Sequence, residues 1–134
     1  MRNLLRCHHE FARPYLGHGE MLRPPTVSGD VPTLTMEGTE GPFSAPAVEG
    51  TAWRAPDGSV GIFFFNYDDE PHPFIWKTDV AEIAGLDASK RLQITQWTAE
   101  RGSKTLKTIN GGMIGDTTDI APRGLIALKL EEIN

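Results

Sequence analysis

Hydrophobic and polar residues alternate in short runs along most of the chain, and turn residues separate the runs. The clearest runs span residues 47–55, 59–66, 72–78, 91–98, 105–109 and 124–132, with a shorter one at 33–37 and an ambiguous one at 113–120. Alternation with a period of two is typical of β-strands whose faces meet different surroundings. Turn signals every ~8–12 residues are typical of a sandwich. The pattern predicts an all-β fold, an antiparallel β-sandwich of about seven or eight strands with one short N-terminal helix.

One run stands out because it is apolar on both faces. In residues 59–66 (SVGIFFFN), Phe64 shares a face with Val60 and Ile62, while Phe63 and Phe65 lie on the other face. A strand of this kind is usually central and covered on both sides. The last run, residues 124–132, instead separates its faces cleanly, with apolar residues inward and Lys129 and Glu131 outward.

The beginning of the chain has a different period. In residues 2–13, apolar positions recur at helical spacing, and Pro14 is expected to stop or kink the helix near Ala12 or Arg13. A helix of about three turns is marginal alone, so it must pack on the rest of the chain or on a body that is missing. We therefore divide the chain into an N-terminal helical segment, residues 1–16, and a β-sandwich domain, residues 17–134. Residues 17–46 are rich in Gly, Pro, Ser and Thr and predict mostly loop, while Asp79 can cap a helical turn over residues 79–85.

Composition and charge exclude several classes of protein. The 134 residues include 39% hydrophobic and 23% charged residues, as in an ordinary globular domain, with a net charge of -5. Because the basic residues are scattered, the chain lacks the clustered Lys and Arg of a nucleic-acid-binding surface. Cys7 is the one cysteine, which rules out a disulfide within the chain. No apolar run approaches the ~20 residues of a membrane span, so neither nucleic acid nor membrane is expected as a partner.

A search for chemistry finds no catalytic residue, metal site or cofactor motif. His9 and Glu10 begin an HExxH pattern, but Arg13 stands where the second histidine should be. A metal cluster is suggested by the types and spacing of Cys7, His8, His9 and His18. The side chains of adjacent helical residues such as His8 and His9 point about 100° apart, which argues against a shared ion. The acidic triplet of residues 68–70 predicts a solvated turn, with a calcium loop as the minor alternative. Sequential turn residues do not provide the two opposed carboxylates of a glycosidase.

Four aromatic residues are candidates for stacking on a sugar ring. They lie in or beside predicted strands, where an exposed ring can cover the C–H face of a pyranose. Strand tryptophans more often fill a sandwich core, and that alternative stays open for each of them. The candidate carbohydrate-binding residues are Trp53, Trp76, Trp97 and Tyr67.

Three stretches carry a resemblance to a known class of protein. They are residues 11–25 (FARPYLGHGEMLRPP), 51–74 (TAWRAPDGSVGIFFFNYDDEPHPF) and 120–132 (IAPRGLIALKLEE). Together they resemble the tail of large glycoside-hydrolase-like proteins, in which a (β/α)₈ barrel ends in a helix and is followed by an antiparallel β-sandwich. The resemblance implies an aspartate-glycine turn before an apolar strand that ends in an asparagine, here Asn66. Because the catalytic carboxylates of such proteins lie in the barrel, which this sequence lacks, no catalytic residue is carried over.

The resemblance leads to one principal hypothesis and two alternatives. The chain is expected to be a non-catalytic ancillary domain of a glycoside hydrolase that supports or borders a catalytic barrel absent from this chain, which makes the chain a fragment or the product of a truncated gene. Its N-terminal helix would then be the last barrel helix. The first alternative is an independent carbohydrate-binding module, with carbohydrate as its partner. The second is a structural domain that self-associates through the N-terminal helix.

Overall fold

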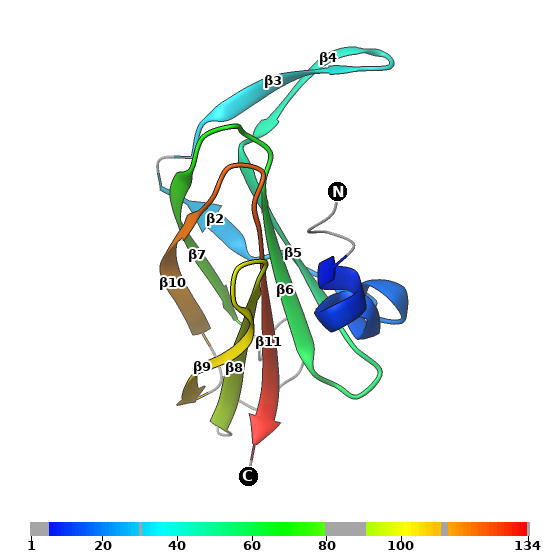
Figure 1. Cartoon of the computed structure of the whole chain (residues 1–134), viewed down its shortest axis with the longest axis vertical. Helices are drawn as coiled ribbons and strands as arrows, with labels where there is room; N and C mark the ends of the chain where they lie inside the picture. Colours follow the sequence, from blue (N-terminus) through cyan, green and yellow to red (C-terminus); the bar gives the residue numbers. More distant parts are fainter. Residues whose placement is uncertain (1–5, 30, 80–90, 111–112, 134) are drawn as a thin grey trace.

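The computed structural model shows two packed sheets, one helical segment and a projecting hairpin (Figure 1). It describes residues 6–29, 31–79, 91–110 and 113–133. The helical segment is η1 (His8–Gly17). The strands are β1 (Glu20–Leu22), β2 (Thr26–Ser28), β3 (Thr33–Gly38), β4 (Gly41–Pro46), β5 (Val48–Arg54), β6 (Val60–Asn66), β7 (His72–Asp79), β8 (Arg91–Thr98), β9 (Gly102–Asn110), β10 (Met113–Ile120) and β11 (Leu125–Ile133).

The strands form sheets of unequal size. Six of them make one sheet in the order β1-β5-β6-β11-β8-β9, and three make the other in the order β10-β7-β2. All the pairings are antiparallel, which confirms the predicted all-β sandwich. The described residues alone form eleven strands, more than the predicted seven or eight. The surplus includes β1, β2 and β4, which lie in the stretch expected to be mostly loop. Strands as short as β1 and β2 are fixed by their partners β5 and β7 rather than by a pattern of their own.

The main core lies between the two sheets. The strand β6 lies between β5 and β11 and is buried at nearly every position, as the two-sided apolar run predicts. Phe64 packs against Phe74 and Trp76 of the facing sheet, with ring centroids 5.0 and 5.5 Å apart. The same core contains the inward side chains of the last strand, which confirms that strand's predicted orientation. The largest other members are Leu22, Ile62, Leu92, Ile94, Ile114, Ile120, Ile126, Leu128 and Leu130.

The helical segment differs from the predicted helix in where it ends. It continues through Pro14 to Gly17 as a π-helix instead of stopping near Ala12. Because proline has no N–H, it leaves the carbonyl four residues earlier without its α-helical partner. The i→i+5 pattern of a π-helix offers that carbonyl the next N–H, so the wider turns accommodate Pro14. The helical turn expected over residues 79–85 lies almost wholly outside the described residues.

The hairpin β3–β4 stands apart from the sandwich (Figure 1). Its strands pair from Thr33 and Pro46 to Gly38 and Gly41, and within the described residues neither packs more than marginally on another element. The sequence predicts the short strand at 33–37 but a loop over 38–46. We call this hairpin, residues 33–46, the arm.

Candidate interaction surface

The segment η1 packs on the outer face of the six-stranded sheet and creates a second core there. Tyr15 is 2% exposed, and its ring meets Phe63 at 6.0 Å in an edge-to-face arrangement. The ring lies over Gly61, where an added Cβ would stand 2.7 Å from Tyr15 Cγ. Phe11, Ala12 and Tyr15 of η1 thus pack within this chain, whereas Leu16 stays exposed. The buried members of this second core are Cys7, Ala12, Tyr15, Ala55, Phe63, Trp97 and Ala127.

Polar contacts fix the first turns of the helical segment on the sheet. Trp97 Nε1 donates to Glu10 Oε2 at 2.8 Å, and the Arg6 guanidinium lies 5.6 Å from the centre of the Trp97 ring. Arg6 also donates to the Ala99 carbonyl at 3.0 Å. Burial raises the pKa of the Cys7 thiol to about 12, and the nearby Glu10 carboxylate adds to this. The thiol is therefore protonated at neutral pH and acts as a small apolar group.

A second set of polar contacts holds the other end of η1. Tyr15 Oη and Ser59 Oγ are 2.8 Å apart, and Ser59 Oγ donates to Asp57 Oδ1 at 2.7 Å. Burial raises the pKa of Tyr15 to about 12, despite the opposing effect of the Ser59 hydrogen bond. Hydrogen bonds from the hydroxyl and the backbone N–H of Ser59 lower the pKa of Asp57. These contacts join η1 to the β5–β6 turn, which carries the predicted aspartate-glycine signal.

Beside η1, the outer face continues as an apolar groove of about 370 Å³. Phe65 and Tyr67 line it with ring centroids 4.8 Å apart, and both rings are partly exposed. Tyr67 Oη donates to Glu49 Oε2 at 3.2 Å, which places a carboxylate at the rim. Burial, with a contribution from Glu49, raises the pKa of Tyr67. The other side chains that line the groove include Cys7, Leu16, Thr51, Phe63 and Leu125. We call this hollow the outer groove.

The structure separates the four aromatic residues predicted to bind carbohydrate. Trp97 is fully buried and Trp76 is 4% exposed, so neither ring presents a face on which a sugar could stack in this conformation. Trp53 and Tyr67 keep part of their surface exposed, and Trp53 Nε1 donates to Thr51 Oγ1 at 3.1 Å. These two lie near opposite ends of β5, because Tyr67 follows Asn66, which pairs with Val48. Five residues of strand span roughly 16 Å, so the two rings do not form one platform.

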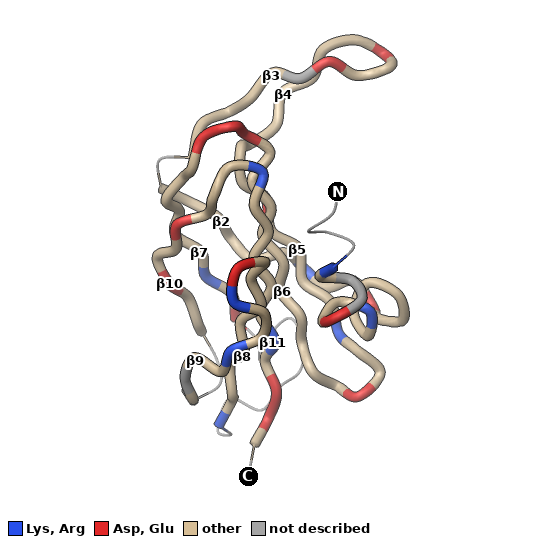
Figure 2. The backbone as a smooth tube through the Cα atoms, viewed as in Figure 1, with Lys and Arg blue, Asp and Glu red and all other residues tan. Residues whose placement is uncertain are grey.

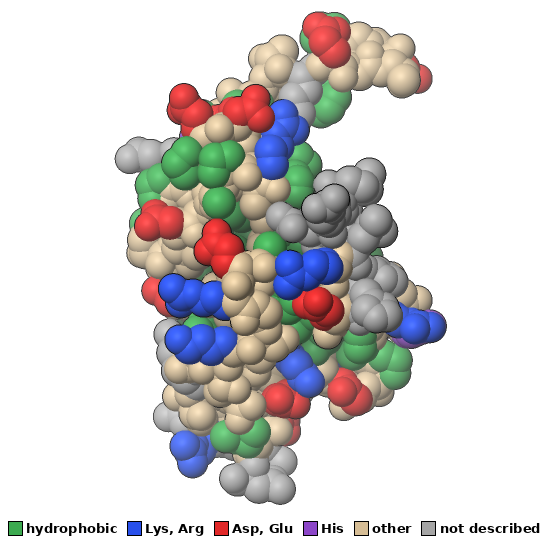
Figure 3. Space-filling model, in the orientation of Figure 1, with side chains coloured by type: hydrophobic (Ala, Val, Ile, Leu, Met, Phe, Trp, Pro, Cys, Tyr) green, Lys and Arg blue, Asp and Glu red, His purple; other side chains and the backbone are tan. Residues whose placement is uncertain are grey.

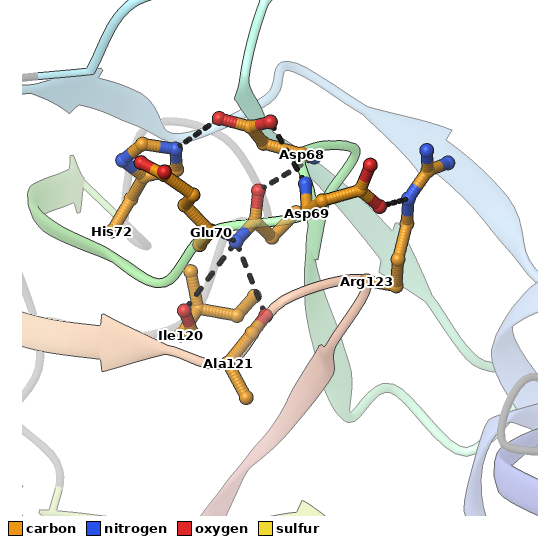
Figure 4. Close-up of polar contacts among 8 residues, drawn as sticks. Asp68, Asp69, Glu70, His72, Ile120, Ala121 and Arg123 are labelled. Carbon is orange, nitrogen blue, oxygen red and sulfur yellow. Dashed lines mark hydrogen bonds and ion pairs between the residues drawn. The ribbon is translucent and has the colours of Figure 1, made fainter.

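The acidic triplet belongs to a turn that is tied to the neighbouring β10–β11 turn (Figure 4). Asp68 Oδ2 lies 2.8 Å from His72 Nε2, and Asp69 Oδ1 accepts from Arg123 Nε at 3.0 Å. The hydrogen bond to His72 is the main cause that lowers the pKa of Asp68. Beneath the turn, Asn66 is fully buried, and its amide donates to the Glu70 and Ala121 carbonyls at 2.8 and 3.1 Å. The asparagine and the acidic residues noted in the sequence thus hold two turns together.

No metal site forms among the residues that the structure describes. Within them, no three His, Cys, Asp or Glu side chains are grouped so that they could hold an ion. Cys7 is buried in the second core, whereas His18 is exposed at the end of η1. The side chains of His8 and His9 lie outside the described set. Within the same described residues, no helix is long and apolar enough to cross a membrane.

Two further hollows lie elsewhere on the sandwich. A cleft of about 470 Å³ opens between the sheets at the flank formed by β8, β9 and β10, with Trp76 and Ile94 in its wall. Polar residues such as Gln96 and Asp116 also line it, and Asp116 Oδ1 accepts from the Thr117 N–H at 2.8 Å. Inward-facing polar residues on edge strands are a common protection against unwanted strand pairing. The other hollow, about 760 Å³, lies between η1 and the polar half of the outer face.

Comparison with solved structures finds glycoside hydrolases. The chain is similar to a Bacillus halodurans protein assigned as an α-N-acetylgalactosaminidase, with 12% identity over 76% of this chain and a TM-score of 0.46. It is similar to a GH27 β-L-arabinopyranosidase from Geobacillus stearothermophilus, with 9% identity over 77% and a TM-score of 0.43. A bifunctional glucanase-xylanase from a metagenome library gives 15% identity over 69% and a TM-score of 0.40.

The extent of these matches matters more than their number. The chain spans only 20%, 20% and 18% of the three matched proteins, so it is similar to a part of each and not to a whole enzyme. The matched proteins are of the class that the sequence resemblance names. TM-scores below 0.5 do not define a shared family. No family model matches the chain, and no curated protein sequence matches it.

Proposed function

We propose that the chain is a non-catalytic ancillary β-sandwich domain that docks against the catalytic barrel of a glycoside hydrolase. The observation that carries the proposal is the outer groove. The outer face of an ordinary sandwich is polar and solvated. Here that face is apolar beneath η1 and remains apolar beyond it, where Phe65, Tyr67 and Leu125 are only partly covered.

The proposal takes the class of partner from the sequence resemblance. In the proteins that residues 11–25 and 51–74 resemble, a sandwich of this kind follows a barrel, and the strand that carries Phe65 belongs to the second of these stretches. A partly exposed apolar surface beside a packed helix is a suitable docking face for a second body. Interfaces between domains of one protein bury surfaces of this mixed character.

The proposal is tested by binding to barrels that lack their own sandwich. The probes are the Bacillus halodurans and Geobacillus stearothermophilus hydrolases named above, each with the segment that this chain matches deleted. We expect the purified chain to bind one or both in isothermal titration calorimetry. Phe65→Asp should abolish binding because it places a charge in the outer groove. Ile75→Asp is the matched control, since Ile75 is 47% exposed on β7 of the other sheet.

Two results would overturn the proposal. One is binding to neither barrel, and the other is hydrolysis of aryl glycosides by the rigorously purified chain alone. A saturable fluorescence change with an oligosaccharide, lost in Trp53→Ala or Tyr67→Ala, would favour the carbohydrate-binding module instead. A concentration-dependent dimer that Phe65→Asp dissociates would favour the self-associating domain.

A further inference from the structure

The arm has one apolar and one polar face. In an antiparallel pair, directly opposed residues lie on the same face. Leu34 opposes Ala45, and Phe43 lies two residues before Ala45, so these three share a face. On the other face Thr35 opposes Ser44, with their hydroxyl oxygens 3.5 Å apart. The arm is thus an amphipathic ribbon, although it has no core of its own to cover.

The apolar face of the arm is poorly covered within the described residues. Phe43 is 50% exposed, and Leu34 and Ala45 are only partly buried. Figure 3 shows the arm standing clear of the rest of the molecule. A two-stranded hairpin is at best marginally stable in water unless it packs against something. A partner that covers the apolar face would stabilise the hairpin.

The base of the arm is firmly held, so the arm projects in a defined direction. The Ala47 N–H donates to the Pro32 carbonyl at 2.8 Å, and Ala47 is fully buried. Val31, on the other side of the base, packs against the main core. In the view of Figure 1, the tip of the arm and η1 lie on the same side of β5 and β6. In this view the tip of the arm points toward the side of the molecule that carries η1 and the second core.

The base of the arm also adjoins the outer groove. The chain passes from Pro46 directly into β5, where Glu49 pairs with Phe65, and the Tyr67 N–H donates to the Ala47 carbonyl at 2.8 Å. The rings of Phe65 and Tyr67 thus lie at the end of the sheet from which the arm emerges. A body seated in the outer groove would therefore lie next to the base of the arm.

Charge indicates what kind of surface fits between them. The arm carries Glu37 and Glu40 and has no Lys or Arg, and Glu49 lies at the rim of the outer groove. The acidic turn of residues 68–70 lies at the same end of the molecule, as Figure 2 shows, although Arg123 neutralises Asp69 there. The surface complementary to the arm and the outer groove is an apolar ridge flanked by basic side chains.

We infer that the arm and the outer groove form one clasp, which grips an apolar ridge with basic flanks on the partner barrel. This inference rests on the proposed function and adds to it the arm as a second contact. The contacts that the arm would make with the partner lie far from η1. Two separated contacts fix the orientation of the partner as well as its position. Acidic residues around the clasp make association faster and dependent on ionic strength.

The test uses the two truncated barrels and the full chain. The arm variant is Phe43→Ser, which keeps the backbone pairing with residue 36 but removes the largest exposed apolar group of the arm. We expect binding at least tenfold weaker than wild type, about 1.4 kcal/mol. Thr35→Ser, on the polar face, is the matched control and should bind as wild type. For the wild-type chain, raising the salt concentration from about 50 to about 500 mM, which spans the screening range, should weaken binding to the barrel.

The outcomes distinguish this inference from the proposed function. If Phe43→Ser binds with wild-type affinity while Phe65→Asp loses binding, the arm is not a contact with the partner. That result overturns this inference and leaves the docking proposal standing. Binding to neither barrel overturns both. A dimer of the chain that Phe43→Ser dissociates shows that a second copy occupies the clasp and also overturns the inference. Far-ultraviolet circular dichroism of each variant confirms that the fold is intact.

Discussion

Adding a single methyl group at Gly61 should weaken the docking of η1. In Gly61→Ala the new Cβ would lie 2.7 Å from Tyr15 Cγ and 3.0 Å from Phe63 Cε2, closer than a relaxed carbon contact. Gly61 is itself buried in β6, so the methyl group has no other direction to take. Either the Tyr15 ring moves away or the strand shifts, and both disturb the second core.

The magnitude follows from two opposing effects. Overpacking by one methyl group in a tight core costs about 1–3 kcal/mol. Replacing a glycine inside a strand returns about 0.5–1 kcal/mol of backbone entropy. We therefore expect Gly61→Ala to lower the free energy of unfolding by about 1–2 kcal/mol. Full detachment of the ring would also forfeit the Ser59 hydrogen bond and the contact with Phe63, which limits how far the ring moves.

A double-mutant cycle isolates the contact. Gly61→Ala, Tyr15→Ala and the double variant are unfolded in urea, with tryptophan fluorescence as the signal. In the Tyr15→Ala background the two closest approaches are gone and only the approach to Phe63 Cε2 at 3.0 Å remains. The added methyl group should therefore cost much less there, and the coupling should reach about 1 kcal/mol. Thr105→Ala, at an exposed position of β9, is a control expected to stay within about 0.5 kcal/mol of wild type. Equal costs of Gly61→Ala in both backgrounds would refute the packing of Tyr15 on β6.

Three more predictions concern buried polar groups and the titration of single residues. Asn66→Ala should cost about 1–3 kcal/mol in urea unfolding, because it removes the hydrogen bonds that the fully buried Asn66 side chain makes to the Glu70 and Ala121 carbonyls and to the Asp68 N–H; an unchanged midpoint would contradict the proposed link between the turns. In a carboxyl titration followed by NMR, Asp57 should titrate below its ordinary pKa of 3.8, and Ser59→Ala should raise the midpoint toward that value. Since the pKa of Asp57 is lowered in the folded state, its contribution to stability is present above pH ~4 and is lost as the pH falls through the folded pKa. Cys7 should react with a disulfide reagent at pH 8 far more slowly in the native chain than in urea, because a pKa raised from 9.0 to about 12 leaves a much smaller fraction of thiolate. Fast native labelling would mean that η1 is detached.

The sequence predicted the centre of the sandwich better than its periphery. The strands β6 and β11 have patterns set by their own side chains, because both lie inside the larger sheet. β6 meets a core on each face, and β11 directs Ile126, Leu128 and Leu130 into the main core. The strands β1 and β2 have only three residues each and no periodicity to detect. Their existence depends on backbone pairing with β5 and β7, which a local pattern does not reveal.

The candidate site was only partly visible in the sequence. Tryptophans within alternating strands were open to two interpretations, and burial of Trp76 and Trp97 was decided by which face of each strand met a core. The arm was missed because Gly38, Gly41 and the prolines of β4 are typical of loops. Its signal is the opposition of Leu34 to Ala45, which becomes meaningful only once the turn at residues 39–40 fixes the register.

In the second core, two apolar surfaces that the sequence predicts separately pack against each other. The helical stripe that includes Phe11 and Ala12 required an apolar partner, and the odd-numbered face of residues 59–66 required a cover. Each requirement alone is equally consistent with a missing body. The structure brings them together, because Phe11, Ala12 and Tyr15 of η1 pack against the sandwich. The apolar surface left over after η1 is docked is the outer groove around Phe65 and Tyr67. If the proposed barrel docks there, the neighbouring arm limits the directions from which it approaches.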